Sequence, residues 1–242
     1  MTGDATGLPV AWVVGAGGIG SALGARLAAD HRVVLFDRVR PAEAAGAEAF
    51  HQVDAADRAA FGAAASGAVR DYGSPAVVAL TLGHVSSATV HEAAPEQVDR
   101  IVRDNFTACV NVLHTVHRQT RGSSCACLVV TSNAALTARP NQPLYAAVKA
   151  AVAALVRSLA VGWAADGIRL VGLAPGTVMV ERNAERVRSQ YPAAPMAPGR
   201  PGGRLVTPAE LADFAAALLP HVDQLTGQVI AFDGGSTLEA RR

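Results

Sequence analysis

The sequence predicts an α/β fold in which one parallel sheet is covered by helices on both faces. Short apolar segments alternate with longer segments of helical spacing along the whole chain, which is typical of this class. Most apolar segments are continuous, as expected for strands buried on both faces. The composition does not change along the chain and no repeat is present. We therefore expect a single domain over residues 1–242, with an ordered core from about 8 to 238.

The first predicted unit is a strand, a glycine turn and a helix. Val10–Val14 is a buried strand, and residues 21–29 have helical spacing. Between them lies G-A-G-G-I-G, a pattern that lets the backbone approach a pyrophosphate at a helix N-terminus. The alternative is a glycine turn that only packs the helix on the strand, but the context favours a dinucleotide site. The residues expected to contact the dinucleotide are Gly15, Gly17, Gly18, Ile19 and Gly20.

An acidic residue follows the second predicted strand, Arg32–Phe36. Asp37 lies 17 residues after Gly20, close to the spacing of about 20 at which a carboxylate accepts hydrogen bonds from the adenosine ribose. It would also repel a 2′-phosphate, so NAD is favoured over NADP. Arg38 follows directly and is suited to bind that phosphate, which keeps NADP as the alternative. A plain turn residue is the second interpretation of Asp37.

The remaining elements continue the same alternation. Strands are predicted at residues 49–53, 76–82, 126–131, 168–173 and 228–232. Helices are predicted at 55–72, 95–121, 144–165 and 208–219. The proline-rich segment 177–204 is predicted to be irregular and to form a lid over the substrate.

Composition excludes several classes of protein. The formal charge is +1 and the arginines are scattered, so neither a nucleic-acid nor a membrane-surface partner is expected. The N-terminal residues lack the order of a signal peptide, and no apolar run approaches the roughly 20 residues that span a bilayer. Three cysteines without ligand spacing predict neither disulfides nor a metal site. A cytoplasmic location is expected.

The stretch from Ser132 to Lys149 contains the candidate catalytic centre. Tyr145 and Lys149 are four residues apart, so they share one face of a helix. Lys149 is the only lysine among 21 Lys and Arg residues, which indicates a role that a planar guanidinium does not fill. An ammonium group near a phenol lowers its pKa, and we expect Lys149 to do this for Tyr145.

These residues together resemble the short-chain dehydrogenase/reductase family. Asn105, Ser132, Tyr145 and Lys149 match the family's catalytic set in order, with intervals of 27, 13 and 4 residues. The segment T-G-Q-V-I-A-F-D-G-G near the C-terminus is similar to that of 3-oxoacyl-carrier-protein-reductase-like members. The resemblance covers nearly the whole chain. It implies a single-domain Rossmann fold, a doubly wound parallel sheet of seven strands in the order 3-2-1-4-5-6-7, with helices on both faces.

The resemblance also implies roles for individual residues. Tyr145 would transfer the proton, Lys149 would hold the nicotinamide ribose, Ser132 would bind the substrate oxygen, and Asn105 would hold a water. Further cofactor contacts are implied for Asp54, which would meet the adenine ring, and for Gly83, Pro175, Gly176 and Val178. A homotetramer or homodimer built on two long helices and the last strand is implied as well.

The chain departs from the family pattern at three places. Its glycine loop is one residue shorter than the family's TGxxxGxG, with Val14 in place of Thr. The family's N-N-A-G is here Leu80-Thr81-Leu82-Gly83, which keeps only the glycine. The Thr expected to bind the nicotinamide amide is Val180, so Thr177 or main-chain groups would have to replace it.

The substrate is a small molecule on this interpretation, and three functions remain open. The first is NAD(H)-dependent interconversion of a secondary alcohol and a ketone. The second is NADPH-dependent reduction of a 3-oxoacyl thioester, which Asp37 disfavours. The third is a non-catalytic dinucleotide-binding regulator. The candidates for substrate contact are His84, Asn133, Arg139 and Tyr191, each with the alternative of a solvated loop residue.

Overall fold

The computed structural model describes residues 7–42, 46–197 and 201–238. Seven parallel strands form one sheet in the order β3-β2-β1-β4-β5-β6-β7, which confirms the predicted fold class. The strands are β1 (Val10–Val14), β2 (Arg32–Asp37), β3 (Ala47–Gln52), β4 (Pro75–Leu80), β5 (Cys125–Val130), β6 (Ile168–Pro175) and β7 (Val229–Phe232). The order reverses between β1 and β4, so their carboxyl ends diverge and leave room for a ligand.

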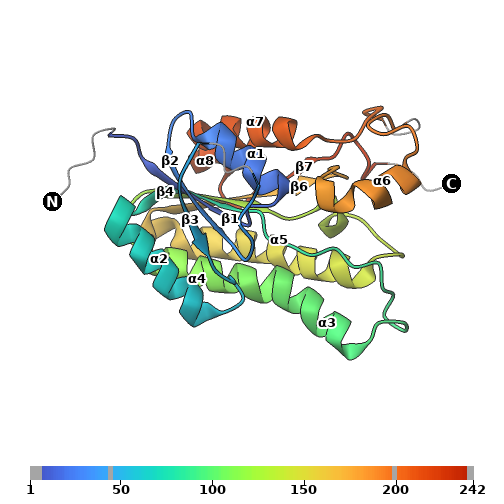
Figure 1. Ribbon diagram of the computed structural model, residues 1–242, viewed down its shortest axis with the longest axis horizontal. Helices are drawn as coiled ribbons and strands as arrows, with labels where there is room; N and C mark the ends of the chain where they lie inside the picture. The colour runs from blue at the N-terminus through green and yellow to red at the C-terminus, as the bar shows by residue number, and fades with distance from the viewer. Residues whose placement is uncertain (1–6, 43–45, 198–200, 239–242) are drawn as a thin grey trace.

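Helices cover both faces of the sheet (Figure 1). One face carries α2 (Arg58–Tyr72), α4 (Ala108–Thr120) and α5 (Pro143–Trp163). The other carries α1 (Gly18–Leu27), α7 (Pro208–Leu218) and α8 (Val222–Leu225). Pro143 opens α5 and Pro208 opens α7, where the missing N–H group costs no helical hydrogen bond. At the start of α7, Thr207 and Glu210 also form a capping box.

The two layers pack through alternate residues of the same strands. On β1, Trp12 and Val14 pack with α2, α4 and α5, whereas Ala11 and Val13 pack with α1 and α7. All five residues of β1 are buried, as its continuous apolar sequence predicts. The sheet is therefore buried on both faces, and the loops that follow the carboxyl ends of its strands lie outside this packed core.

Three features of the secondary structure differ most from prediction. Strand β4 ends at Leu80, so Thr81 and Leu82 lie in the loop beyond it. The helix predicted over 95–121 is interrupted: α3 (Pro95–Val102) passes through a π-helical turn, η1 (Arg103–Thr107), into α4. The segment predicted to be irregular contains α6 (Ala184–Gln190), which buries only Val187 and so lacks an apolar periodicity. Residues 198–200 of the expected lid lie outside the described residues.

Helix α5 corrects the expectation about membrane-length apolar runs. Together with the following turn, Pro143–Asp166 is long and apolar enough to cross a membrane, and it is the one such helix in the described part of the chain. It packs on the sheet through Val152, Val156 and Ala160. It also carries Tyr145 and the buried Lys149, so we assign its apolar character to the core.

Candidate active site

Two cavities open at the carboxyl ends of the strands. The smaller one, of about 110 Å³, is lined by the glycine loop, the end of β2 and the segment around Asp54. The larger one, of about 580 Å³, is lined by the end of β5, the start of α5 and the 175–191 segment. Ile19, Thr81 and Gly83 line both, so the two cavities adjoin.

The glycine loop between β1 and α1 leaves no room for a side chain at Gly15, Gly18 or Gly20. Gly15 has φ of +98°, which favours glycine. A Cβ on Gly20 would lie 1.8 Å from the Gly15 carbonyl oxygen, and one on Gly18 would lie 2.6 Å from Val180 Cγ1. All five loop residues predicted to contact a dinucleotide line the smaller cavity. The shorter loop therefore still offers bare backbone and a helix N-terminus to a pyrophosphate.

Thr81 is a site residue that the sequence analysis did not select. Its hydroxyl donates a short hydrogen bond to the Gly15 carbonyl and a second, of 3.3 Å, to the Val14 carbonyl. It thus ties the glycine loop to the end of β4, at the place where the family pattern has polar residues. In the sequence, Thr81 is distinguished by its hydroxyl within the otherwise apolar segment L-T-L-G, and this could have indicated a role at the site.

Asp37 points into the smaller cavity from the end of β2. One carboxylate oxygen accepts a hydrogen bond from Ala16 N at 2.6 Å, and the other accepts one from Val39 N at 3.2 Å. A carboxylate has about four acceptor positions, so both oxygens retain capacity for ribose hydroxyls. Its neighbour Arg38 also lines the cavity but directs Nη1 toward Asp104 Oδ1, 3.5 Å away.

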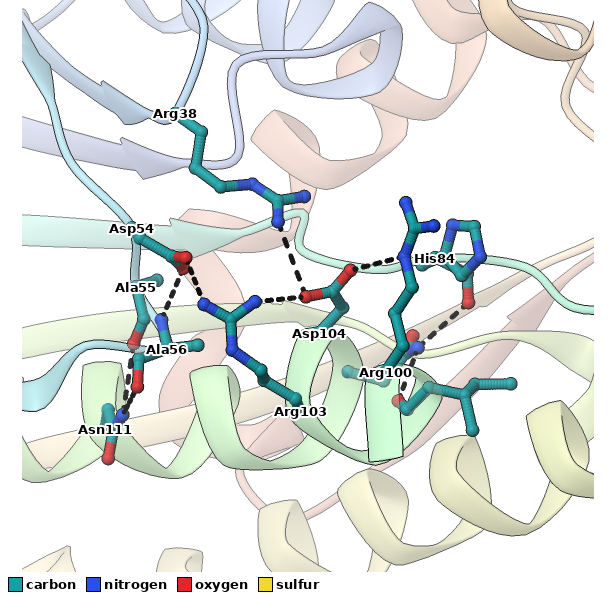
Figure 2. A network of polar contacts seen from close by, with 11 residues as sticks. Arg38, Asp54, Ala55, Ala56, His84, Arg100, Arg103, Asp104 and Asn111 are labelled. Carbon is teal, nitrogen blue, oxygen red and sulfur yellow. Dashed lines mark hydrogen bonds and ion pairs between the residues drawn. The ribbon is translucent and has the colours of Figure 1, made fainter. Parts of the chain in front are cut away.

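A network of acidic and basic side chains surrounds the outer wall of this cavity (Figure 2). Asp104 is buried in the π turn, with Arg38, Arg100 and Arg103 around its carboxylate at 3.5, 3.7 and 3.1 Å. Arg103 also makes a short ion pair with Asp54. Burial would raise the pKa of Asp54, but hydrogen bonds from Ala56 N and Arg103 outweigh it and hold that pKa below its ordinary value. Asp104 and Arg103 were not selected from the sequence.

Lys149 is buried between β4 and β5 at the inner wall of the larger cavity. Its ammonium group donates to the Leu82 carbonyl at 3.0 Å and to the Val130 carbonyl at 3.3 Å. Burial lowers the pKa of Lys149 to about 8. Two carbonyl oxygens, one in the loop after β4 and one at the end of β5, therefore hold the only lysine in one place.

Tyr145 is half-buried and lines the larger cavity with Ser132. The expectation that Lys149 lowers the Tyr145 pKa is wrong in this structure. The pKa of Tyr145 is raised, because burial disfavours the phenolate more than Ser132, Arg182 and Arg186 favour it. The Lys149 ammonium lies 5.9 Å from the centre of the phenol ring and directs its protons at carbonyls.

Asn105 lies in the π turn with its side chain fixed at one end. Its amide nitrogen donates to the His84 and Ile101 carbonyls at 2.9 and 3.0 Å. Its buried Oδ1 has no hydrogen-bond partner among the described residues. A Cβ on Gly83 would lie 2.8 Å from this oxygen and 3.0 Å from Lys149 Nζ, so both groups flank Gly83. An acceptor beside the lysine suits the predicted water.

The structure brings three of the four substrate candidates to the larger cavity. Arg139 and Tyr191 line it, and so does Asn133, whose amide nitrogen donates to Asp233 and Ser236. His84 lines neither cavity, and Figure 2 shows its ring beside Arg100. Burial and Arg100 lower the pKa of His84.

The predicted turn after β6 also reaches the larger cavity. Pro175, Gly176, Thr177 and Val178 line it. Val180, which replaces the family's Thr, packs on Gly18 of the glycine loop instead of offering a hydroxyl. Arg182 and Arg186 line the larger cavity too and were not selected, although their spacing of four residues places them on one helical face.

Comparisons with known proteins agree with this geometry. A family profile described as "Enoyl-(Acyl carrier protein) reductase" matches residues 15–237. A cis-4-hydroxycyclohexanecarboxylate dehydrogenase from Sinomonas cyclohexanicum is 32% identical, with 97% of this chain and 99% of that protein aligned. A tropinone reductase homolog from Datura stramonium is 36% identical, but only 59% of this chain and 55% of that protein are aligned.

A solved structure has the same fold. The ligand-free aldohexose dehydrogenase of Thermoplasma acidophilum superposes with a TM-score of 0.87 at 22% identity, covering 97% of this chain and 96% of that one. The family profile, which spans most of the chain, and the full-length Sinomonas relative establish the family. The protein belongs to the short-chain dehydrogenase/reductase family, whose members are oxidoreductases that bind NAD or NADP.

Proposed function

We propose that the protein is an NAD(H)-dependent oxidoreductase that interconverts a secondary alcohol and a ketone on a small molecule. The observation that carries the proposal is the adjacency of two sites. Ser132, Tyr145 and Lys149 line one cavity, and that cavity adjoins the glycine cradle of the other.

The residues present fit a nicotinamide dinucleotide. The glycine cradle, the carboxylate of Asp37 and the buried unpaired oxygen of Asn105 are the groups that such a ligand and its water would use. When bound, the nicotinamide supplies the hydride chemistry. The residues of the chain orient the substrate and transfer one proton.

Three side chains carry that task. The Ser132 hydroxyl holds the substrate oxygen and steadies the charge that develops on it. The Tyr145 hydroxyl exchanges a proton with that oxygen. Lys149 is held by the Leu82 and Val130 carbonyls, and the family resemblance implies that it would hold the nicotinamide ribose. The raised Tyr145 pKa suits proton donation to a ketone, and proton acceptance from an alcohol would need a change at this site on ligand binding.

The preference for NAD over NADP rests on the end of β2. The Asp37 carboxylate faces the smaller cavity and would repel a 2′-phosphate. Arg38, the residue suited to bind that phosphate, is directed at the Asp104 carboxylate. Reduction of a 3-oxoacyl thioester with NADPH is the second candidate, favoured by the C-terminal T-G-Q-V-I-A-F-D-G-G segment and opposed by Asp37.

Replacement of Tyr145 by Phe tests the mechanism. We expect turnover of the best alcohol or ketone to fall by about 10² to 10⁴-fold, the usual contribution of a positioned acid or base. Binding of NADH, followed by its fluorescence, is expected to stay within about twofold. Tyr72→Phe is the matched control, because Tyr72 lies at the end of α2 away from both cavities. Near-normal activity of Tyr145→Phe would contradict the mechanism.

We also propose that the protein is a homotetramer or a homodimer. The family resemblance implies such an assembly, and α5, one of the long helices expected to form it, carries a large aliphatic side chain, Val161, that is 83% exposed. Light scattering after size exclusion measures the mass directly. A monomer at micromolar concentration would contradict this proposal.

A further inference from the structure

The larger cavity has an uneven charge. Three arginines line it: Arg139, Arg182 and Arg186. No Asp or Glu is among the described residues that line it. Lys149 lines it as well, and the remaining lining groups are amides, hydroxyls, aliphatic side chains and main-chain groups, so the described lining of this cavity is cationic.

Helix α6 and the turn before it distribute charge by face. Arg182, Arg186, Ser189 and Gln190 line the cavity and follow helical spacing, whereas Glu181, Glu185 and Arg188 do not line it. The acidic side chains of this segment therefore face away from the cavity and the two arginines face into it.

Arg182 and Arg186 differ in their contacts from several other arginines of the protein. Arg103, Arg169 and Arg204 each contact a carboxylate. Within the described residues, neither Arg182 nor Arg186 makes an ion pair or a side-chain hydrogen bond. Both lie near enough to Tyr145 to favour its phenolate. Their guanidinium groups are thus available on the catalytic side of the cavity.

Arg182 also lines the smaller cavity, so the cofactor competes for it. Arg186 and Arg139 line only the larger one. A guanidinium binds a carboxylate, sulfonate or phosphate through paired hydrogen bonds. Val85, Val178 and Val180 supply apolar wall for the carbon skeleton.

We propose that the substrate is an anionic hydroxy or keto acid, whose charged group is bound by Arg186 and Arg139 while its hydroxyl or carbonyl meets Ser132 and Tyr145. This inference rests on the proposed function, which assigns the hydroxyl or carbonyl group that reacts. It adds the chemical class of the group at the other end of the substrate. Arg186 is then a specificity-determining residue rather than a surface cation.

The test is a binding measurement that needs no turnover. Cyclohexanecarboxylate and its uncharged counterpart cyclohexanecarboxamide, neither of which can react, are titrated calorimetrically into protein saturated with NADH. We expect the carboxylate to bind at least about tenfold more tightly, the usual effect of a charge-assisted pair. Added salt should reduce the difference, because both arginines are reached by solvent.

Two variants in the segment 181–190 test whether Arg186 causes the preference for the carboxylate. Arg186→Gln should remove most of the preference for the carboxylate, whereas Arg188→Gln, which makes the same change on the face away from the cavity, should leave it unchanged. Equal binding of the two compounds, binding of neither, or equal loss in both variants would overturn the proposal. The proposed function fails differently, through absence of turnover of any alcohol or ketone while the carboxylate still binds.

Discussion

The proposed catalytic centre around Lys149 and the charged network around Asp104, at the proposed adenosine end of the smaller cavity, hold their polar groups in different ways. Around Lys149 the groups are buried, few and fixed, with each donor meeting a backbone carbonyl. Around Asp104 one buried carboxylate is surrounded by three arginines whose side chains are 49–64% exposed. We expect the loss of any one of the buried contacts around Lys149 to have a large effect. The contacts around Asp104 are redundant and screened, so each one contributes little alone.

Gly83→Ala tests the buried contacts around Lys149 and is the variant with the largest expected effect. The added Cβ would lie 2.8 Å from Asn105 Oδ1 and 3.0 Å from Lys149 Nζ, so the Asn105 side chain must shift and the Lys149 side chain must yield by a few tenths of an ångström. Displacement of positioning groups by about 1 Å costs on the order of 10²-fold in rate. We expect kcat to fall by that factor while circular dichroism shows a folded protein. Gly62→Ala is the control, because its Cβ would meet nothing within 4 Å. Unchanged kcat would show that the centre is adaptable.

The pH dependence of the free energy of unfolding also tests the buried groups around Lys149. The folded pKa of Lys149, about 8, lies below its ordinary value of 10.5. Between these values the unfolded chain binds more protons, so the contribution of Lys149 to the free energy of unfolding rises with pH, by at most about 1.4 kcal/mol per unit. Denaturant titrations of the protein and of Lys149→Met between pH 8 and about 9.5 should diverge accordingly. A difference that falls with pH would mean that the site favours the charged amine.

Asp104→Asn tests the adenosine end. The change removes the carboxylate toward which Arg38 is directed, so the guanidinium becomes available to a 2′-phosphate. We expect the ratio of NADPH to NADH affinity, measured by fluorescence titration, to rise about tenfold. The double variant Arg38→Gln, Asp104→Asn should lose this gain. If the gain persists in the double variant, Arg38 is not the residue that Asp104 restrains.

Arg100→Gln has the smallest expected effect. Its contact with Asp104 is 3.7 Å long and its side chain is 64% exposed, and two other arginines remain near the carboxylate. Exposed pairs typically contribute about 0–1 kcal/mol. We expect a change in the free energy of unfolding below about 0.5 kcal/mol and no change in NADH affinity. A loss comparable with that of Asp104→Asn would show that the network acts as one unit.

The sequence by itself determined the sheet and the spacing of the catalytic set. Continuous apolar strands and the glycine turn depend on local rules, and the four-residue interval of Tyr145 and Lys149 is a property of any helix. The same rules missed the π turn, the end of β4 and α6, since each depends on contacts with distant segments.

Only the tertiary structure decided which side chains face one another. Arg38 and Asp104 are 66 residues apart, and Thr81 reaches a glycine loop 66 residues before it. No local pattern encodes such pairs. The structure also corrected the direction of the Tyr145 pKa, because desolvation depends on everything packed around the ring. Spacing along the sequence indicated which groups to propose as reacting groups, whereas packing determined the direction of their pKa shifts and their neighbours.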